Sequence, residues 1–195
     1  MTQNAVMPRP IRSQRVFLIG FMGAGKTSAG QALADRLGWT FQDLDQVIER
    51  RAGQSVAGIF AAQGETGFRR MESEALQELL SQPLDATRGM IVALGGGAFV
   101  QPENRAVLQK AGAAAVTILL EAPLDELRRR CARDNAGDTR PLARDAQKFA
   151  ALLAQRRKDY ERAQLHVDTM GKSVEEVAVE IERVLRDVIQ PEVEQ

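Results

Sequence analysis

The sequence predicts an α/β protein with three layers, in which a parallel sheet lies between two layers of helices. Three almost continuous apolar runs support this prediction: 15–20 (RVFLIG), 90–95 (MIVALG) and 115–120 (AVTILL). Such runs are typical of strands that are buried on both faces of a parallel sheet. Longer amphipathic segments separate them, which favours strand–helix alternation. The chain has 195 residues, 44% hydrophobic and 27% charged, which suits one soluble globular domain.

The remaining elements follow from shorter patterns. Two weaker strands are expected at 39–43 and 165–169. Helices are expected at 26–37, 44–51, 65–80, 145–163 and 173–189, together with one that Pro123 opens. The last helix starts with SVEE, a capping box. We expect a disordered arm over 1–14, a single domain over 15–189, a mobile lid at about 134–144 and a C-terminal tail over 190–195.

Composition argues against several classes of partner. The 26 basic and 26 acidic residues cancel and no long basic run occurs, so no nucleic-acid partner is expected. The apolar runs are too short to span a membrane, and the N-terminus lacks the apolar region of a secretory signal. Cys131 is the single cysteine, so no intrachain disulfide can form, which fits a cytoplasmic protein. The sequence shows no exposed apolar stripe that would favour an oligomer, so we expect a monomer.

The strongest motif lies directly after the first predicted strand. Gly20, Gly25, Lys26 and Thr27 satisfy G-x-x-x-x-G-K-[ST], and a helix is predicted to follow. Glycines allow backbone N–H groups to converge on phosphate oxygens, and the helix N-terminus favours an anion. Lysine would reach the β- and γ-phosphates, and the threonine hydroxyl would bind Mg²⁺. The alternative is a glycine-rich turn that binds nothing.

In proteins with this loop, an acidic residue at the end of a neighbouring apolar strand usually supports the metal. This sequence has no acid at the expected strand end. The apolar run 90–95 ends in Gly95, Gly96 and Gly97 rather than in an acid. These glycines leave open space that suits a substrate's close approach, or form a plain turn. The acids Asp43 and Asp45 lie where a strand meets a helix, at the same end of the sheet as the phosphate loop. Asp45 either acts on a ligand or only caps the helix.

Three arginines lie in positions that favour an anionic ligand. Arg156 falls within the apolar stripe of the helix at 145–163, where a buried charge needs an anionic partner unless the side chain turns outward to solvent. Arg69 and Glu72 are three residues apart on the helix at 65–80, near its start, and form either part of a site or a surface ion pair. Arg140 lies in the predicted lid and could close onto a transferring phosphate or stay solvated.

Together these stretches resemble shikimate kinase, a small P-loop kinase of the nucleoside-monophosphate-kinase type. The resemblance extends from about Arg15 to Arg186 and rests on GFMGAGKT, DLD, GQSVAGIFAAQGETGFRRME, LGGGA, ENR, RDNAGDTRPL and QRRKDY. It implies a five-stranded parallel sheet in the order 2-3-1-4-5. It also implies transfer of the γ-phosphoryl group of ATP to the 3-hydroxyl of shikimate, with Mg²⁺ as cofactor, in aromatic amino-acid biosynthesis.

The resemblance also implies a role for each matching residue. Lys26, Asp45 and Arg140 would be catalytic, with Asp45 holding ring hydroxyls and helping to deprotonate the attacking one. Thr27 would bind Mg²⁺ directly, and Asp43 would bind it through water. Nucleotide would contact Gly23, Ala24, Gly25, Lys26, Thr27, Ser28, Arg133, Arg140 and Lys172. Shikimate would contact Asp45, Phe60, Phe68, Arg69, Glu72, Gly95, Gly96, Gly97 and Arg156, with Glu72 orienting Arg69.

The sequence departs from the family pattern in two places and leaves two rival functions. RRKDY (156–160) stands where the family often has R-x-P-L-Y, and RPLA (140–143) stands where RPLL is common. The first departure affects a helix locally, and the second affects lid closure. One rival is another small-molecule kinase, such as a gluconate-type enzyme. The other is a catalytically silent sensor, which should lack Lys26, Asp45 or Arg140, although all three are present.

Overall fold

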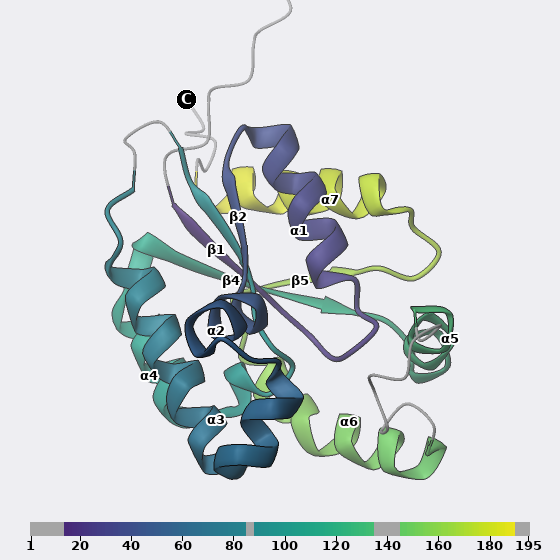
Figure 1. Cartoon of the computed structure of the whole chain (residues 1–195). Helices are drawn as coiled ribbons and strands as arrows, with labels where there is room; N and C mark the ends of the chain where they lie inside the picture. Colours follow the sequence, from purple (N-terminus) through teal and green to yellow (C-terminus); the bar gives the residue numbers. More distant parts are fainter. Residues whose placement is uncertain (1–13, 85–87, 135–144, 190–195) are drawn as a thin grey trace, which may run out of the picture.

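The computed structural model describes residues 14–84, 88–134 and 145–189, and within them a parallel sheet separates two groups of helices (Figure 1). The strands are β1 (Arg15–Ile19), β2 (Thr40–Asp43), β3 (Met90–Ala93), β4 (Ala115–Glu121) and β5 (Leu165–Asp168). Their order is β2-β3-β1-β4-β5, so the predicted 2-3-1-4-5 arrangement is confirmed. The predicted arm over 1–14, apart from Gln14, the tail over 190–195 and most of the predicted lid lie outside the described residues.

The sheet is parallel throughout, and β1 is its centre. Arg15 is in register with Met90 of β3 and with Ala115 of β4. All of β1 and β3 is buried, as their continuous apolar sequences predict. Because every strand points the same way, all five carboxyl ends lie at one edge of the sheet. The loops that follow the strands therefore meet at that edge.

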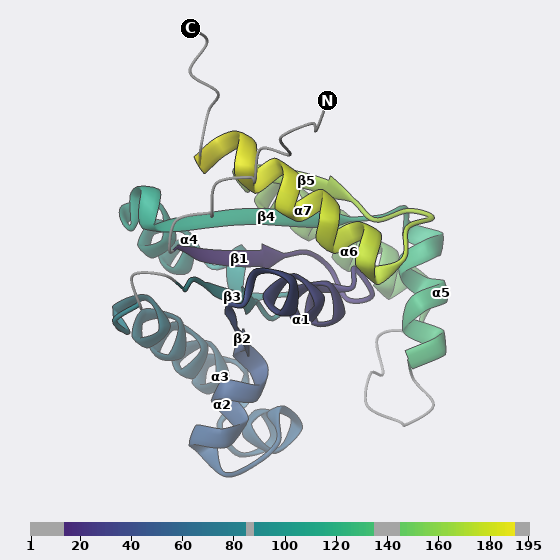
Figure 2. The same cartoon turned by 90° about the horizontal axis from the view of Figure 1, so that it is seen from above.

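The helices cover the two faces of the sheet. They are α1 (Lys26–Leu37), α2 (Leu44–Ala52), α3 (Val56–Ser81), α4 (Pro102–Lys110), α5 (Leu124–Asp134), α6 (Ala146–Tyr160) and α7 (Val174–Ile189). α1 and α7 lie together on one face, whereas α3, α4 and α6 lie on the other (Figure 2). Six of these helices fall where the sequence predicts a helix, and α4 was not predicted. None of the helices in the described ranges is long and apolar enough to cross a membrane.

The helix α3 is longer than predicted because two helical segments join at Gly64. The sequence predicts a helix only over 65–80, but the helix begins at Val56, where the Ser55 hydroxyl caps it by accepting from Gly58 N at 3.2 Å. Gly64 has φ 68° and ψ −175°, a combination that only glycine adopts readily. The second segment of α3 begins directly after this break, as the predicted helix over 65–80 does, so Arg69 lies near the start of that segment, as expected. This break sets the direction of the half that carries Arg69 and Glu72.

We expect Gly64→Ala to lower the free energy of unfolding by about 1–3 kcal/mol, because an alanine side chain disfavours this backbone conformation. A Cβ at Gly64 would meet no atom within 4 Å, so the cost is conformational rather than steric. Gly58→Ala is the matched control, since Gly58 has ordinary helical geometry and only ordinary contacts around its Cβ. That change should be neutral or stabilising by up to about 1 kcal/mol. Urea unfolding of both variants checks the prediction, and equal stabilities would contradict it.

Candidate functional site

The loop between β1 and α1 has the shape of a phosphate-binding loop. Gly23 and Gly25 have φ of 80° and 86°, so the chain can turn with its N–H groups directed inward. The Lys26 ammonium folds back over the loop and donates to Gly20 O at 2.9 Å and to Phe21 O at 3.1 Å. The predicted strand–loop–helix context is therefore present. A cation and a helix N-terminus face the same space, which is an arrangement that attracts phosphate.

The two oxygen groups predicted to support a metal lie in contact. Thr27 Oγ1 donates to Asp43 Oδ2 at 2.8 Å, which joins the start of α1 to the end of β2. The described residues contain no group of three or more His, Cys, Asp or Glu side chains that could hold a metal ion.

The residue that caps α2 is Asp43 and not Asp45. Asp43 Oδ1 accepts from Asp45 N at 3.1 Å and from Gln46 N at 3.4 Å. The interpretation of Asp45 as only a helix cap is therefore wrong. Its side chain is directed instead toward the glycine run after β3, where a Cβ placed on Gly95 would lie 2.6 Å from Asp45 Oδ1.

The glycine run Gly95–Gly97 is filled by charged side chains rather than by open space. A Cβ at Gly95 would also lie 3.2 Å from Glu72 Oε1, and one at Gly96 would lie 3.3 Å from Arg156 Nη1. A Cβ at Gly97 would collide with the Arg69 guanidinium. The expectation of open space is wrong, because the missing side chains are what allow these charges to gather. The run thus collects predicted residues from three different helices.

The Arg69–Glu72 pair is largely withdrawn from solvent. Arg69 Nη1 lies 2.9 Å from Glu72 Oε2, and the two side chains are 18% and 1% exposed. Arg69 Nη2 also contacts Glu65 Oε1 at 3.2 Å, a partner that sequence reasoning missed although it lies one helical turn away. The alternative of an ordinary surface ion pair is therefore wrong.

Glu72 has an unusual electrostatic environment. Its burial raises the pKa of the carboxyl to about 7, against the opposing effect of the Arg69 guanidinium and with a smaller contribution from the Asp45 carboxylate. Oε1 is buried and accepts no hydrogen bond within the described part of the chain. A buried carboxyl in this state can change its protonation near neutral pH.

Arg156 turns inward, as its place in an apolar stripe predicts. Its Nη1 donates to Gly96 O at 3.0 Å, and its guanidinium carbon lies 5.9 Å from the centre of the Phe21 ring. Tyr160, one turn later, also donates its hydroxyl to Gly96 O. The alternative in which Arg156 extends outward to solvent is therefore wrong.

The acids close to Arg156 in sequence are engaged elsewhere. Asp159 lies 3.1 Å from Arg105, and Glu161 lies 2.9 Å from Arg157. Among the described residues, no carboxylate forms an ion pair with Arg156. The direct contacts of this partly buried guanidinium include a carbonyl oxygen and an aromatic ring, and the Glu72 carboxyl interacts with its charge without forming an ion pair. An anionic ligand could therefore still pair with it.

Arg69 and Arg156 line one cavity, which we call the acceptor cavity. It has a volume of about 530 Å³ and lies between α3 and α6, lined by Phe60, Glu65, Arg69, Lys148, Ala151, Leu152, Gln155 and Arg156. Phe60 stacks on Phe68, with 4.7 Å between ring centres, which places aromatic surface beside Arg69. Lys148 and Gln155 were not predicted; they are seven residues apart and share a face of α6 that lies next to Arg156.

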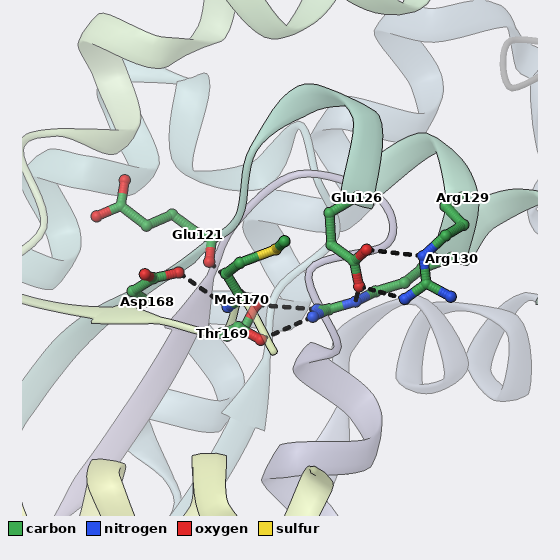
Figure 3. Close-up of polar contacts among 7 residues, drawn as sticks. All are labelled: Glu121, Glu126, Arg129, Arg130, Asp168, Thr169 and Met170. Carbon is green, nitrogen blue, oxygen red and sulfur yellow. Dashed lines mark hydrogen bonds and ion pairs between the residues drawn. The ribbon is translucent and has the colours of Figure 1, made fainter. Parts of the chain in front are cut away.

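A second cavity lies beside the phosphate loop, and we call it the nucleotide cavity. It has a volume of about 460 Å³ and takes its walls from the loop, α5 and the segment after β5. The predicted residues Gly23, Ala24, Gly25, Ser28, Arg133 and Lys172 line it. Lys172 Nζ donates to Asp168 O at 2.8 Å. Glu126, Arg129, Arg130 and Thr169 also line it and were not predicted (Figure 3). Arg140 lies outside the described residues.

Glu72→Gln should change how stability depends on pH. A carboxyl with an ordinary pKa near 4.5 when unfolded and about 7 when folded binds more protons in the folded state between these values. The free energy of unfolding of the parent chain should therefore fall, as pH rises through this window, by roughly 2–3 kcal/mol relative to a variant that cannot titrate. Urea unfolding at pH 5 and pH 8 tests this, with Glu74→Gln on the same helix as an exposed control. A pH-independent difference between parent and Glu72→Gln would contradict the prediction.

A family model and named relatives both match this chain over most of its length. The family model described as shikimate kinase matches residues 22–186. A protein named shikimate kinase from Geobacter metallireducens is 41% identical over 181 residues, which cover 91% of this chain and 95% of that protein. A second, from Geobacter sulfurreducens, is 40% identical over 184 residues, which cover 93% of this chain and 96% of that protein.

Solved structures agree in fold. A structure titled shikimate kinase from Acinetobacter baumannii in complex with shikimate has a TM-score of 0.77 and 32% identity, and the match covers 93% of this chain and 96% of that one. A gluconokinase from Sinorhizobium meliloti has a TM-score of 0.62 with 16% identity, over 93% and 95% of the two chains, which shows a shared fold alone. Because the family model matches residues 22–186 and the relatives cover about nine tenths of the chain, the chain belongs to the shikimate kinase family.

Proposed function

We propose that this chain transfers the γ-phosphoryl group of ATP to the 3-hydroxyl of shikimate, giving shikimate 3-phosphate and ADP, a step in aromatic amino-acid biosynthesis. One observation carries the proposal: Arg69, Arg156 and Asp45 converge on the glycine run next to a phosphate loop. Shikimate is a ring with one carboxylate and several hydroxyls. Two guanidiniums suit the carboxylate, and one carboxylate suits the hydroxyls.

The acceptor would bind with its carboxylate between Arg69 and Arg156. Arg69 already shares its charge with Glu72 and Glu65, which hold its fork in place. Arg156 brings charge that no carboxylate of the described residues neutralises through an ion pair. The stacked rings of Phe60 and Phe68 would form an apolar wall for the ring of the substrate. A carboxylate held at one end directs the hydroxyls at the other end toward Asp45 and the phosphate loop.

The donor would lie across the nucleotide cavity with its phosphates on the loop. Backbone N–H groups of Gly23, Gly25 and Ser28 would contact the phosphates, and Lys26 Nζ would exchange its bonds with Gly20 O and Phe21 O for phosphate oxygens. Thr27 and Asp43 would hold Mg²⁺, Thr27 directly and Asp43 through water, and the ion would neutralise charge on the phosphates. Arg140 would cross from its segment to the phosphates, and Arg133 would stack on adenine.

The chemical step needs a group that takes the proton of the attacking hydroxyl. The hydroxyl oxygen bonds to the γ-phosphorus while the bond to the β–γ bridging oxygen breaks, and the electron pair leaves with ADP. Asp45 would accept the proton, because its carboxylate faces the glycine run, which Arg156 contacts from the wall of the acceptor cavity. Glu72, whose carboxyl lies near Asp45, would keep Arg69 in place rather than contact the reacting atoms. All these residues belong to one chain, so a monomer is sufficient.

A panel of acceptors tests the proposal against the gluconate-type and silent-sensor alternatives. ADP formation from Mg²⁺–ATP is measured with shikimate, quinate and gluconate offered separately. We expect rapid turnover with shikimate, weak turnover with quinate and none with gluconate. Binding of ATP and shikimate without turnover would indicate a sensor, and faster turnover with gluconate would indicate the other kinase. Either result would contradict the proposal.

Asp45→Asn should lower kcat by about 10²-fold or more, because the amide keeps the shape of the side chain but cannot accept the proton. The KM for ATP should change little, since Asp45 is not among the residues that line the nucleotide cavity. Steady-state kinetics with both substrates varied give the two constants. A variant with nearly normal kcat would remove Asp45 from the mechanism.

Arg156→Ala should weaken shikimate binding by roughly 2–4 kcal/mol, the scale of a lost buried charge pair. Its effect on the apo protein should be small, within about 4 °C in Tm, because loss of the hydrogen bond to Gly96 O and of the ring contact is offset by removal of a partly buried charge. Arg156→Lys should restore little, since an ammonium cannot form the two parallel bonds of a guanidinium. Calorimetric titration with shikimate and thermal unfolding measure the two quantities.

The neighbouring residue supplies the control for Arg156→Ala. Arg157 is exposed and paired with Glu161, and it does not line the acceptor cavity. Arg157→Ala should therefore leave shikimate binding unchanged. An Arg156→Ala variant that unfolds at a much lower temperature but binds shikimate normally would assign this arginine a structural role instead.

A further inference from the structure

The two walls of the nucleotide cavity are joined by one side chain. One wall is α5, which carries Glu126, Arg129 and Arg130, and the other is the segment from Thr169 to Ser173 that follows β5. Figure 3 shows Arg130 extending from α5 toward Thr169. In the described part of the chain, the hydrogen bonds between α5 and this segment are those of Arg130.

The Arg130 guanidinium donates hydrogen bonds to both α5 and Thr169. Its Nε donates to Glu126 Oε1 at 2.6 Å, its Nη1 to Thr169 Oγ1 at 2.9 Å and its Nη2 to Thr169 O at 2.7 Å. The side chain is 20% exposed. A planar fork with several fixed donors can make these bonds at the same time, which a lysine cannot.

Thr169 is well placed to receive this fork. It is 1% exposed, and both its N and its Oγ1 donate to Glu121 O, at 2.8 Å and 3.0 Å. The hydroxyl therefore accepts from Arg130 and donates to the end of β4. Arg130 thus connects α5 to the carboxyl ends of β4 and β5 through one buried hydroxyl.

Arg129 also pairs with Glu126, but it does not join α5 to Thr169. It donates to Glu126 Oε2 at 2.8 Å and to Oε1 at 2.6 Å, it is 56% exposed, and it does not contact Thr169. Hydrogen bonds from Arg129, and next from Arg130, lower the pKa of the Glu126 carboxyl to about 2, so it stays ionised at neutral pH. The two arginines thus differ mainly in the contact with Thr169.

We propose that Arg130 is a positioning residue that fixes the spacing between the walls of the nucleotide cavity and so determines how tightly the base is held. This rests on the proposed binding of ATP in that cavity. The phosphate loop lies between β1 and α1, whereas the hydrogen bonds of Arg130 within the described residues go to Glu126 and Thr169, so binding of the phosphates should not depend on Arg130. The base would lie between α5 and the Thr169–Ser173 segment, where a small change of spacing removes contacts on one side.

Substitutions on both sides of the contact test the proposal. Arg130 itself lines the nucleotide cavity, but Thr169 is 1% exposed, so a loss caused by removing its hydroxyl acts through Arg130. Arg130→Lys keeps the charge but cannot bridge Glu126 and Thr169, and Thr169→Val keeps the shape but loses the hydroxyl. Both should raise the Kd for Mg²⁺–ATP about tenfold, the effect of a lost hydrogen bond to a charged group. Both should also reduce the preference for ATP over GTP. Thr169→Ser keeps the hydroxyl and should bind ATP as the parent chain does.

The controls separate positioning from phosphate binding and from loss of fold. Arg129→Lys changes an arginine with the same acidic partner that also lines the nucleotide cavity, so it reports what altering an arginine of this wall does by itself. The Kd for ATP should rise clearly less in Arg129→Lys than in Arg130→Lys. Inorganic tripolyphosphate, which has no base, should bind equally well to the parent, Arg130→Lys and Thr169→Val, and so should shikimate. Thermal unfolding of Thr169→Ser and Thr169→Val checks that both variants are folded under the conditions of the titration.

Three outcomes would overturn the proposal. They are an unchanged Kd for ATP in Arg130→Lys, an equal loss for Arg129→Lys, or an equal loss for tripolyphosphate, which would make Arg130 a phosphate ligand. All these measurements are binding titrations and need no turnover. Failure of the proposed reaction would leave ATP binding measurable, so it can be told apart from failure of this inference.

Discussion

Parallel pairing of β1 with β3 on one side and β4 on the other is the constraint on which the site depends. It places the ends of all five strands at one edge of the sheet, so loops that are far apart in sequence become neighbours. The phosphate loop follows β1, Asp43 ends β2, the glycine run follows β3, and the segment with Thr169 follows β5. The hydrogen bond from Thr27 Oγ1 to Asp43 Oδ2 at 2.8 Å forms because the loop after β1 and the end of β2 meet at that edge.

This edge carries two cavities with different chemistry. The acceptor cavity, between α3 and α6, gathers two guanidiniums near a buried acid, and its aromatic wall suits a small ring with a carboxylate. The nucleotide cavity, between α5 and the segment after β5, is shaped by an internal network of arginine, glutamate and threonine. The glycine run and the phosphate loop lie at the same edge, so direct transfer between two bound substrates needs no covalent intermediate on the protein.

Much of the fold could be predicted from sequence because its strands are continuous apolar runs and its phosphate loop is a specific motif. The strand order came from the family resemblance rather than from the patterns. The helix Pro102–Lys110 was missed, and so was the first half of α3, because the glycine-rich stretch around Gly58 and Gly64 hides its helical character. Asp43 and Asp45 could not be told apart as cap and ligand by spacing alone. The contact between Arg130 and Thr169 spans 39 positions, so only the tertiary structure reveals it.

We propose that the sheet edge holds both substrates in line for direct transfer, with the acceptor carboxylate on Arg69 and Arg156. The most direct measurement is a crystal structure of this chain with shikimate, Mg²⁺ and a non-hydrolysable ATP analogue. We expect the carboxylate to contact both guanidiniums and the 3-hydroxyl to lie beside Asp45. We also expect that hydroxyl to lie about 3–3.5 Å from the γ-phosphorus. A carboxylate bound away from Arg69 and Arg156, or a 3-hydroxyl directed away from the phosphate, would contradict the account.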